Sequence, residues 1–251
     1  APTQELVDSY IMLNGKGIKE SGSGYDTSNP YSDRDPRLAA TIIYTGNSYK
    51  LPDGSDAVID CNTGNDAYGT TSDVTPTGYY LKKYLDSTID ISASTSSGGK
   101  KHSWVTYRLG EFYLNYAEAV FNYLGSSDAV NSEFTMSACE AINKIRNRAD
   151  VQMPDFPDNL SSDEFIKKYR RERMVELAFE GHRFWDVRRW KEADKYFVNI
   201  EGLQISKTGD NTAYSYSTVV NTRQWDDKMY LFPIPQSERM KNPNLSQNPG
   251  W

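Results

Sequence analysis

The sequence predicts a mainly α-helical fold in which helices support long irregular loops and a few short strands. Between residues 105 and 180, apolar residues recur every three or four positions in three stretches, which is the spacing of amphipathic helices. The first hundred residues are instead rich in Tyr, Asp, Gly and Ser, with many turn signals and only two candidate strands. We therefore divide the chain into residues 1–104, a loop-rich candidate ligand surface, and residues 105–251, a helical region with an extended C-terminal tail.

Composition argues against several classes of protein. The 251 residues carry a formal net charge of −6, so the basic field that non-specific nucleic-acid binding needs is missing. The mean hydropathy is −0.70, and no stretch reaches the roughly 18 apolar residues of a membrane span. The first ten residues lack the pattern of a signal peptide. Cys61 and Cys139 match no metal spacing, and without a phosphate loop or a dinucleotide fingerprint we predict no metal and no cofactor.

Two candidate strands lie in the loop-rich segment. They are residues 38–44 (LAATIIY) and 78–85 (GYYLKKYL), although neither alternates cleanly between apolar and polar positions. Residues 45–77 lie between them and show no strong periodicity. Loops of this length are uncommon unless they have a function or are disordered, so this interval is a candidate binding region.

Tyrosines and short polar side chains suit this region to a sugar. The apolar C–H face of a pyranose can lie on an aromatic ring, while its hydroxyl groups need planar donors and acceptors. The predicted ligand-binding residues are Tyr49, Asn65, Asp66, Tyr68 and, as a weaker choice outside the interval, Trp104. Two alternatives stay open: an acidic surface loop whose tyrosines cover the core, or an Asp/Asn cluster that holds calcium.

Three helices are predicted in the second segment. The first spans residues 105–124 and the second residues 132–150, and the short loop between them predicts antiparallel packing. The third spans residues 161–179 and begins with a capping box formed by Ser161 and Glu164.

The third helix carries a row of carboxylates within its apolar face. At ~100° per residue, Phe165 and Tyr169 lie on one face of this helix. Three glutamates share that face: Glu172, Glu176 and Glu180. A helix that is apolar nearly all round is buried, and buried carboxylates must be paired or neutralised. The arginines expected to pair with them are Arg170, Arg171, Arg173, Arg183, Arg188 and Arg189.

The same row raises an enzymatic alternative. Glu176 and Glu180 are one helical turn apart, roughly 6 Å, a separation that glycosidases use. An acid that protonates a leaving group needs a raised pKa, however, and a surplus of arginines lowers the pKa of a carboxylate. The two histidines, His102 and His182, lie in no nucleophile motif. The residues therefore favour a structural network of glutamates and arginines over catalysis.

The C-terminal tail, residues 230–251, is punctuated by prolines. This composition predicts extended backbone. The tail ends on Trp251, and an aromatic end predicts a terminus that is docked on the body of the protein.

Residues 171–190 (RERMVELAFEGHRFWDVRRW) resemble the signature helix and turn of the SusD/RagB family. Three further stretches match that family in the same order, namely residues 29–37, 107–119 and 142–146. The closing residues 232–251, from FPIP to NPGW, are similar to the usual C-terminus of the family. Family chains are about twice as long, so the resemblance identifies this sequence with their C-terminal half.

The resemblance implies a function. SusD/RagB proteins are outward-facing outer-membrane lipoproteins of Bacteroidetes, and each forms a lid on a SusC-like TonB-dependent transporter. They bind glycans, or peptides in the RagB branch, and do not hydrolyse them. We therefore expect glycan binding for delivery to the transporter, with peptide binding as the alternative. Contact with the membrane is expected only through a lipid anchor in the other half of the family chain.

The resemblance also implies a scaffold of tetratricopeptide-like helix pairs, with the ligand bound by loops that differ between members. Leu109, Gly110 and Tyr113 match the interior triplet of a tetratricopeptide helix, although no 34-residue period recurs in the chain. Since the loops differ, no binding residue can be carried over, and the predicted site rests on side-chain chemistry alone.

Overall fold

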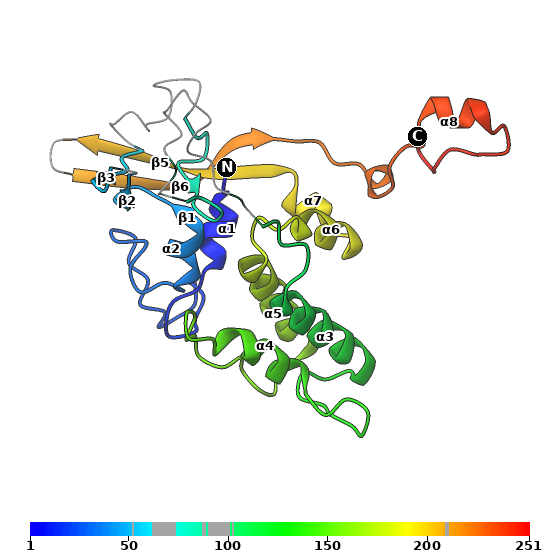
Figure 1. The fold of residues 1–251 in the computed structure, drawn as a ribbon, viewed down its shortest axis with the longest axis horizontal. Coiled ribbons are helices and arrows are strands. Elements are labelled where there is room, and N and C mark those ends of the chain that lie inside the picture. The colour runs from blue at the N-terminus through cyan, green and yellow to red at the C-terminus, as the bar shows by residue number, and fades with distance from the viewer. Residues whose placement is uncertain (52, 62–73, 87–88, 90–100, 102, 209–210) are drawn as a thin grey trace.

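The computed structural model describes residues 1–251 except 52, 62–73, 87–88, 90–100, 102 and 209–210 (Figure 1). Its helices are α1 (Gln4–Ser9), α2 (Arg37–Thr41), α3 (Leu109–Leu124), α4 (Ala138–Arg146), α5 (Ser162–Glu176), α6 (His182–Arg189), α7 (Ala193–Tyr196), α8 (Gln236–Lys241) and the 3₁₀ helix η2 (Asp227–Tyr230). Its strands are β1 (Ile42–Ile43), β2 (Ser48–Lys50), β3 (Asp56–Val58), β4 (Tyr80–Leu81), β5 (Asn199–Thr208) and β6 (Asn211–Thr222). Within the described ranges, every helix is too short or too polar to cross a bilayer.

Helices α3, α4 and α5 form the first of the two larger hydrophobic cores among the described residues, beside a small third cluster of Ile11, Val151 and Met153 (Figure 1). Phe165 is at its centre, stacked on Phe121 with ring centroids 4.2 Å apart and edge-on to Phe156 at 5.8 Å. The predicted packing of the first two helices is confirmed, but α3 begins at Leu109 and α4 spans only Ala138–Arg146. A tetratricopeptide-like superhelix stays a prediction.

The second core lies between α1, α2, β1 and the β5–β6 hairpin. Its fully buried members include Tyr10, Ile42 and Tyr79. Helix α5 contributes to both cores, because Phe165 faces the first and Val175 the second. The predicted burial of this helix is confirmed in part, because it packs into both cores while residues 162–164 and Lys167 are exposed.

The start of α5 follows the sequence prediction closely. The hydroxyl of Ser161 accepts a hydrogen bond from the backbone N–H of Glu164, and the Glu164 carboxylate accepts one from the backbone N–H of Ser161. This capping box satisfies two of the N–H groups that the first turn leaves unpaired.

The first predicted strand, residues 38–44, is mostly wrong. Residues 37–41 form α2, and only Ile42–Ile43 is a strand. Pro36 begins the helix because its fixed φ, here −56°, is already helical, and the Asp35 carboxylate accepts a hydrogen bond from the backbone N–H of Arg37. The second predicted strand shortens to Tyr80–Leu81, which pairs antiparallel with β1.

The long antiparallel hairpin of β5 and β6 was not predicted from the sequence. Gly202 allows it to approach the segment before β4, since a Cβ at this position would lie 2.7 Å from the Cα of Thr77. The backbone N–H of Leu203 donates to the carbonyl of Thr77 at 2.9 Å. This close approach covers the second core.

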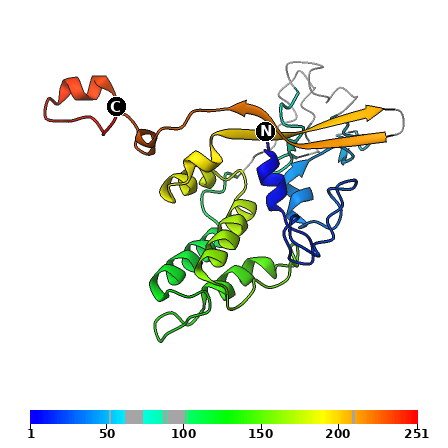
Figure 2. The same cartoon turned by 180° about the vertical axis from the view of Figure 1, so that it is seen from behind.

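The tail leaves the body beyond β6 and carries α8 at its far end (Figures 1 and 2). The predicted docking of Trp251 on the body is wrong, because its indole N–H donates to the carbonyls of Lys228, in η2, and Leu231, just after it, so that the C-terminal segment folds back on itself. The tail is anchored at η2, where the Arg188 guanidinium donates to the carbonyls of Met229 and Tyr230.

Candidate ligand-binding site

Glu176 is at the centre of a network of ion pairs. Its carboxylate contacts Arg37 at 2.9 Å and Arg108 and Arg148 at 2.5 Å each. One turn earlier, Glu172 lies 2.6 Å from Arg146 and 2.8 Å from Arg37. We call this set, together with Glu180 and its partners, the Glu/Arg network. It ties α5 to α2, to the start of α3 and to the end of α4.

Glu172 and Glu176 are buried and paired with arginines, as predicted, whereas Glu180 lies beyond the end of α5 and is half-buried. The predicted arginine partners are wrong. Arg173 instead pairs with Asp186 at 2.7 Å. The arginines that do bind the row come from α2, from the start of α3 and from the end of α4 and the residues just after it. Sequence spacing could not show this, because these partners lie 26 to 139 residues from the glutamates they bind.

The network does not suit the enzymatic alternative. The Glu176 side chain is only 2% exposed. Burial alone would raise its pKa, but the three arginine partners outweigh burial and lower the pKa to about 2. A general acid needs the opposite shift and access to a substrate, so Glu176 fits a structural role.

Glu180 is more accessible and faces a cavity. Burial raises its pKa, but hydrogen bonds from Arg108 and Lys83 outweigh that effect, so the pKa is lowered. The two contacts measure 2.6 Å to Arg108 and 2.5 Å to Lys83. The Glu180 carboxylate is therefore ionised, and Lys83 and Arg108 hold it in position at the edge of the network.

An exposed aromatic pair lies beside this edge. Trp104 is 79% exposed and stacks on Tyr84, with ring centroids 6.3 Å apart and ring planes 22° apart. The Lys83 ammonium lies 5.7 Å from the centre of the Tyr84 ring. Tyr84 has a φ of +77°, a left-handed backbone conformation in the turn after β4. We call Trp104 and Tyr84 the aromatic platform.

A cavity of about 270 Å³ adjoins the platform. Tyr84 and Val105 line it together with charged groups of the network, which include Lys83, Arg108 and Glu180. The chain thus brings two flat rings next to fixed donors and acceptors of both charges.

The structure treats the predicted site residues differently. Trp104 is part of the platform, while Tyr84 was missed because it was assigned to a predicted strand. Tyr49 is half-buried in β2, where it pairs with Ala57 of β3, and no described contact joins it to the platform. Asn65, Asp66 and Tyr68 lie outside the described residues.

The calcium alternative requires a group of metal-ligating side chains. In the part of the chain that the structure describes, a single group has suitable spacing, namely Asp128, Cys139 and Asp158. Burial and the neighbouring Asp128 raise the pKa of the Cys139 thiol to about 12, which favours a neutral thiol. This group is not in the predicted calcium region, residues 45–77.

Comparisons with known proteins give one consistent result. The family model described as SusD family matches residues 1–251. A curated relative, SusD-like protein P2 of Formosa agariphila, is 25% identical over 264 residues, which cover 99% of this chain and 45% of the relative.

Solved structures agree with this match. A SusD-like protein from Bacteroides fragilis superposes with a TM-score of 0.77 at 28% identity, covering 100% of this chain and 47% of that one. A SusD-like carbohydrate-binding protein from the same species gives a TM-score of 0.73 at 28% identity, covering 98% of this chain and 48% of that one. The chain spans about half the length of these relatives.

Proposed function

This chain belongs to the SusD family, and from that premise we propose that it binds glycans without hydrolysing them, at the aromatic platform of Trp104 and Tyr84. A family relative is described as carbohydrate-binding, which supports the class of ligand. The observation that carries the proposal is the exposure of Trp104 at 79% while it is stacked on a second ring.

A platform of this kind suits a pyranose. Burial of a large apolar side chain is favourable by ~1.5–3 kcal/mol. A ligand that covers the exposed stacked pair would therefore gain binding free energy from removing the two rings from water. The C–H face of a sugar can lie on the rings and remove them from water. This contact depends little on which sugar is bound.

The charged groups beside the platform would supply orientation. Lys83 and Arg108 donate hydrogen bonds, and Glu180 accepts them. The hydroxyl groups of a sugar at the cavity would therefore find both donors and acceptors. Because these groups bind each other, they are held in fixed positions before a ligand arrives. Preorganisation of this kind lowers the entropic cost of binding.

Family membership also supports a place in the cell. We infer that the whole protein acts at the outward face of the outer membrane, anchored by lipid, and delivers its ligand to a SusC-like TonB-dependent transporter. Co-purification of the full-length protein with its transporter tests this part separately from ligand binding.

Replacing Trp104 by Ala tests the platform. We expect the variant to bind its glycan about tenfold more weakly, equivalent to about 1.4 kcal/mol, because half of the platform is removed. Affinity gel electrophoresis against a polysaccharide panel identifies the glycan, and calorimetry then measures the dissociation constant. The matched control is Trp185→Ala, which removes a tryptophan that is 58% exposed on α6 and does not line the cavity.

Two results would count against the proposal. Equal weakening by both tryptophan variants would place the glycan elsewhere. Retention of no polysaccharide, together with binding of a mixture of peptides, would indicate the peptide-binding branch of the family instead.

A further inference from the structure

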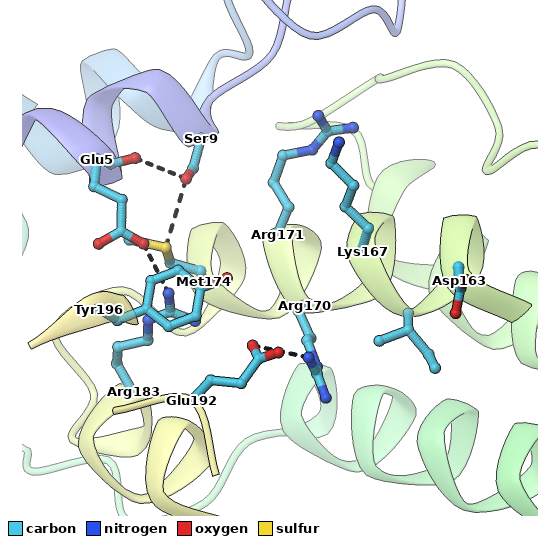
Figure 3. A pocket seen from close by; sticks show the side chains of 11 residues that line it. Glu5, Ser9, Asp163, Lys167, Arg170, Arg171, Met174, Arg183, Glu192 and Tyr196 are labelled. Atoms are coloured by element: carbon cyan, nitrogen blue, oxygen red, sulfur yellow. Dashed lines mark hydrogen bonds and ion pairs between the residues drawn. The ribbon is translucent and has the colours of Figure 1, made fainter. Parts of the chain in front are cut away.

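A second cavity, of about 440 Å³, lies between α1 and α5 and is bounded at one end by residues around α7 (Figure 3). Its volume is within the range of about 300–1,000 Å³ that is usual for small-molecule sites. It shares no lining residue with the cavity beside the platform, so the two are separate sites. Ile166 and Met174 give it an apolar wall, and the remainder of its lining is Ser9, Tyr196 and charged side chains.

Most of the charges in this second cavity neutralise each other. The Arg183 guanidinium lies 2.8 Å from the Glu5 carboxylate and over the ring of Tyr196, at 4.3 Å from its centre. The Arg170 guanidinium lies 2.9 Å from the carboxylate of Glu192 (Figure 3). Within each of these two pairs the opposite charges cancel.

Lys167 and Arg171 are different. They are four residues apart on α5, so they project from the same face, and Figure 3 shows both directed away from Arg170 and Glu192. Like charges at this spacing repel each other by roughly 0.2–0.5 kcal/mol. An anion placed between them would reverse that repulsion.

Neither of these two cations has a close acidic partner among the described residues. The nearest acid to Arg171 is Glu20, at 3.9 Å, which is about 1 Å longer than the two neutralised pairs of the same cavity. Burial lowers the pKa of the Arg171 guanidinium, and the acids around it do not restore it. Lys167 has no ion pair in the described part of the chain. The nearest acid along the helix, Glu164, is bonded to Ser161 in the capping box, and Asp163, which also lines the cavity, lies one turn before Lys167.

We propose that this cavity binds the anionic group of an acidic glycan, a uronate carboxylate or a sulfate ester, between Lys167 and Arg171. The proposal rests on the proposed function and adds a class of ligand to it. Arg171 can donate two parallel hydrogen bonds to a carboxylate or a sulfate, and Lys167 adds a mobile point charge. Ile166 and Met174 provide an apolar surface for the C–H face of the sugar ring.

Calorimetry with three oligosaccharides tests the proposal on the whole protein. The probes are galactotriose, which is neutral, trigalacturonate, which carries carboxylates, and a κ-carrageenan tetrasaccharide, which carries sulfate esters. We expect at least one acidic probe to bind about tenfold more tightly than galactotriose, and this preference to shrink as salt is raised. A preference for one acidic probe only would identify the anionic group.

The decisive variant is Lys167→Gln with Arg171→Gln. We expect it to lose about tenfold in affinity for the preferred acidic probe and to bind galactotriose as the unchanged protein does. The matched control, Lys168→Gln with Arg239→Gln, removes the same charge from residues that do not line the cavity, and should leave all three affinities unchanged. Equal thermal unfolding of both variants shows that the fold is intact.

The outcomes separate the two proposals. If Trp104→Ala abolishes binding of every probe while the Lys167/Arg171 variant binds the acidic probes normally, the acidic site is wrong and the platform stands. If the control variant loses as much affinity as the cavity variant, only the general field of the protein matters and the acidic site is wrong. If no probe binds, both proposals are wrong for these sugars. If inorganic sulfate alone still binds at the cavity, the ligand of the cavity is a free anion and not a glycan.

Discussion

At the scale of single residues, Glu176 shows how a carboxylate can be fully ionised in the interior. Three guanidinium groups surround it, and each reaches it from a different segment of the chain. A buried ion pair adds little stability compared with an apolar contact, but removal of one partner leaves an uncompensated charge. The main contribution of Glu176 to stability is therefore that it neutralises arginines whose charges would be unpaired without it.

Replacing Glu176 by Gln should destabilise the protein by about 3–5 kcal/mol, because three buried or half-buried arginines would lose their common counter-charge. Urea unfolding measures the change. The control is Glu238→Gln, whose carboxylate pairs with Lys241 on the exposed tail helix and should change the stability by less than about 0.5 kcal/mol. Similar effects from both variants would show that the Glu/Arg network does not stabilise the fold.

At the scale of secondary-structure elements, α5 joins the two cores and the β5–β6 hairpin closes the second one. The hairpin can do so because Gly202 lies against the backbone of Thr77. A backbone contact cannot yield in the way that a flexible side chain can, so a side chain at position 202 would push the hairpin away from the core.

Gly202→Ala should therefore destabilise the protein by about 1–3 kcal/mol, the usual cost of overpacking. Thermal unfolding detects this as a lower midpoint. Gln204→Ala is a suitable control, since Gln204 is exposed in the same strand and its loss should be nearly neutral. A neutral Gly202→Ala variant would mean that the hairpin is not pressed against residue 77 in solution.

At the scale of the whole molecule, the Glu/Arg network holds the loop-rich segment and the helical region together. Arg37 comes from the first segment, and Arg108, Arg146 and the acidic row come from the second. The ion pairs of the network thus connect α2 of the loop-rich segment to α3, α4 and α5 of the helical region.

The network predicts how the stability of the whole protein depends on pH. The pKa of Glu176 is about 2 in the folded protein against 4.5 for the ordinary carboxyl group, and the pKa of Glu172 is lowered as well. A lowered pKa stabilises the fold above pH 4.5, and this stabilisation is lost as the pH falls towards 2. For Glu176 alone the loss is about 3 kcal/mol, at 1.36 kcal/mol for each unit of pKa.

Urea unfolding at a series of pH values between 6 and 2 measures this loss. The Glu176→Gln variant should show a shallower decline over the same window, since it lacks the titrating group. Parallel curves for the two proteins would show that Glu176 does not titrate as its surroundings require.

The sequence by itself determined the three helices α3, α4 and α5 and the burial of Glu172 and Glu176. Periodicity and the Ser161 capping box are local signals, and a carboxylate on an apolar face needs a cation wherever the chain finds one. The resemblance to the SusD/RagB family came from the same local stretches, and three of them contain the arginines Arg37, Arg108 and Arg146 that meet the row.

Only the tertiary structure decided which residues meet. Arg37 and Arg108 bind the acidic row, although other arginines are nearer to it in the sequence. Tyr84 lies beside Trp104 and not in the predicted strand, and Lys167 and Arg171 lie together on a cavity wall. The reason is physical: ion pairs and ring stacks form between groups that are close in space, and a sequence reports only distance along the chain. Local patterns therefore predicted the helices α3, α4 and α5, while the folding of distant segments onto α5 formed the sites.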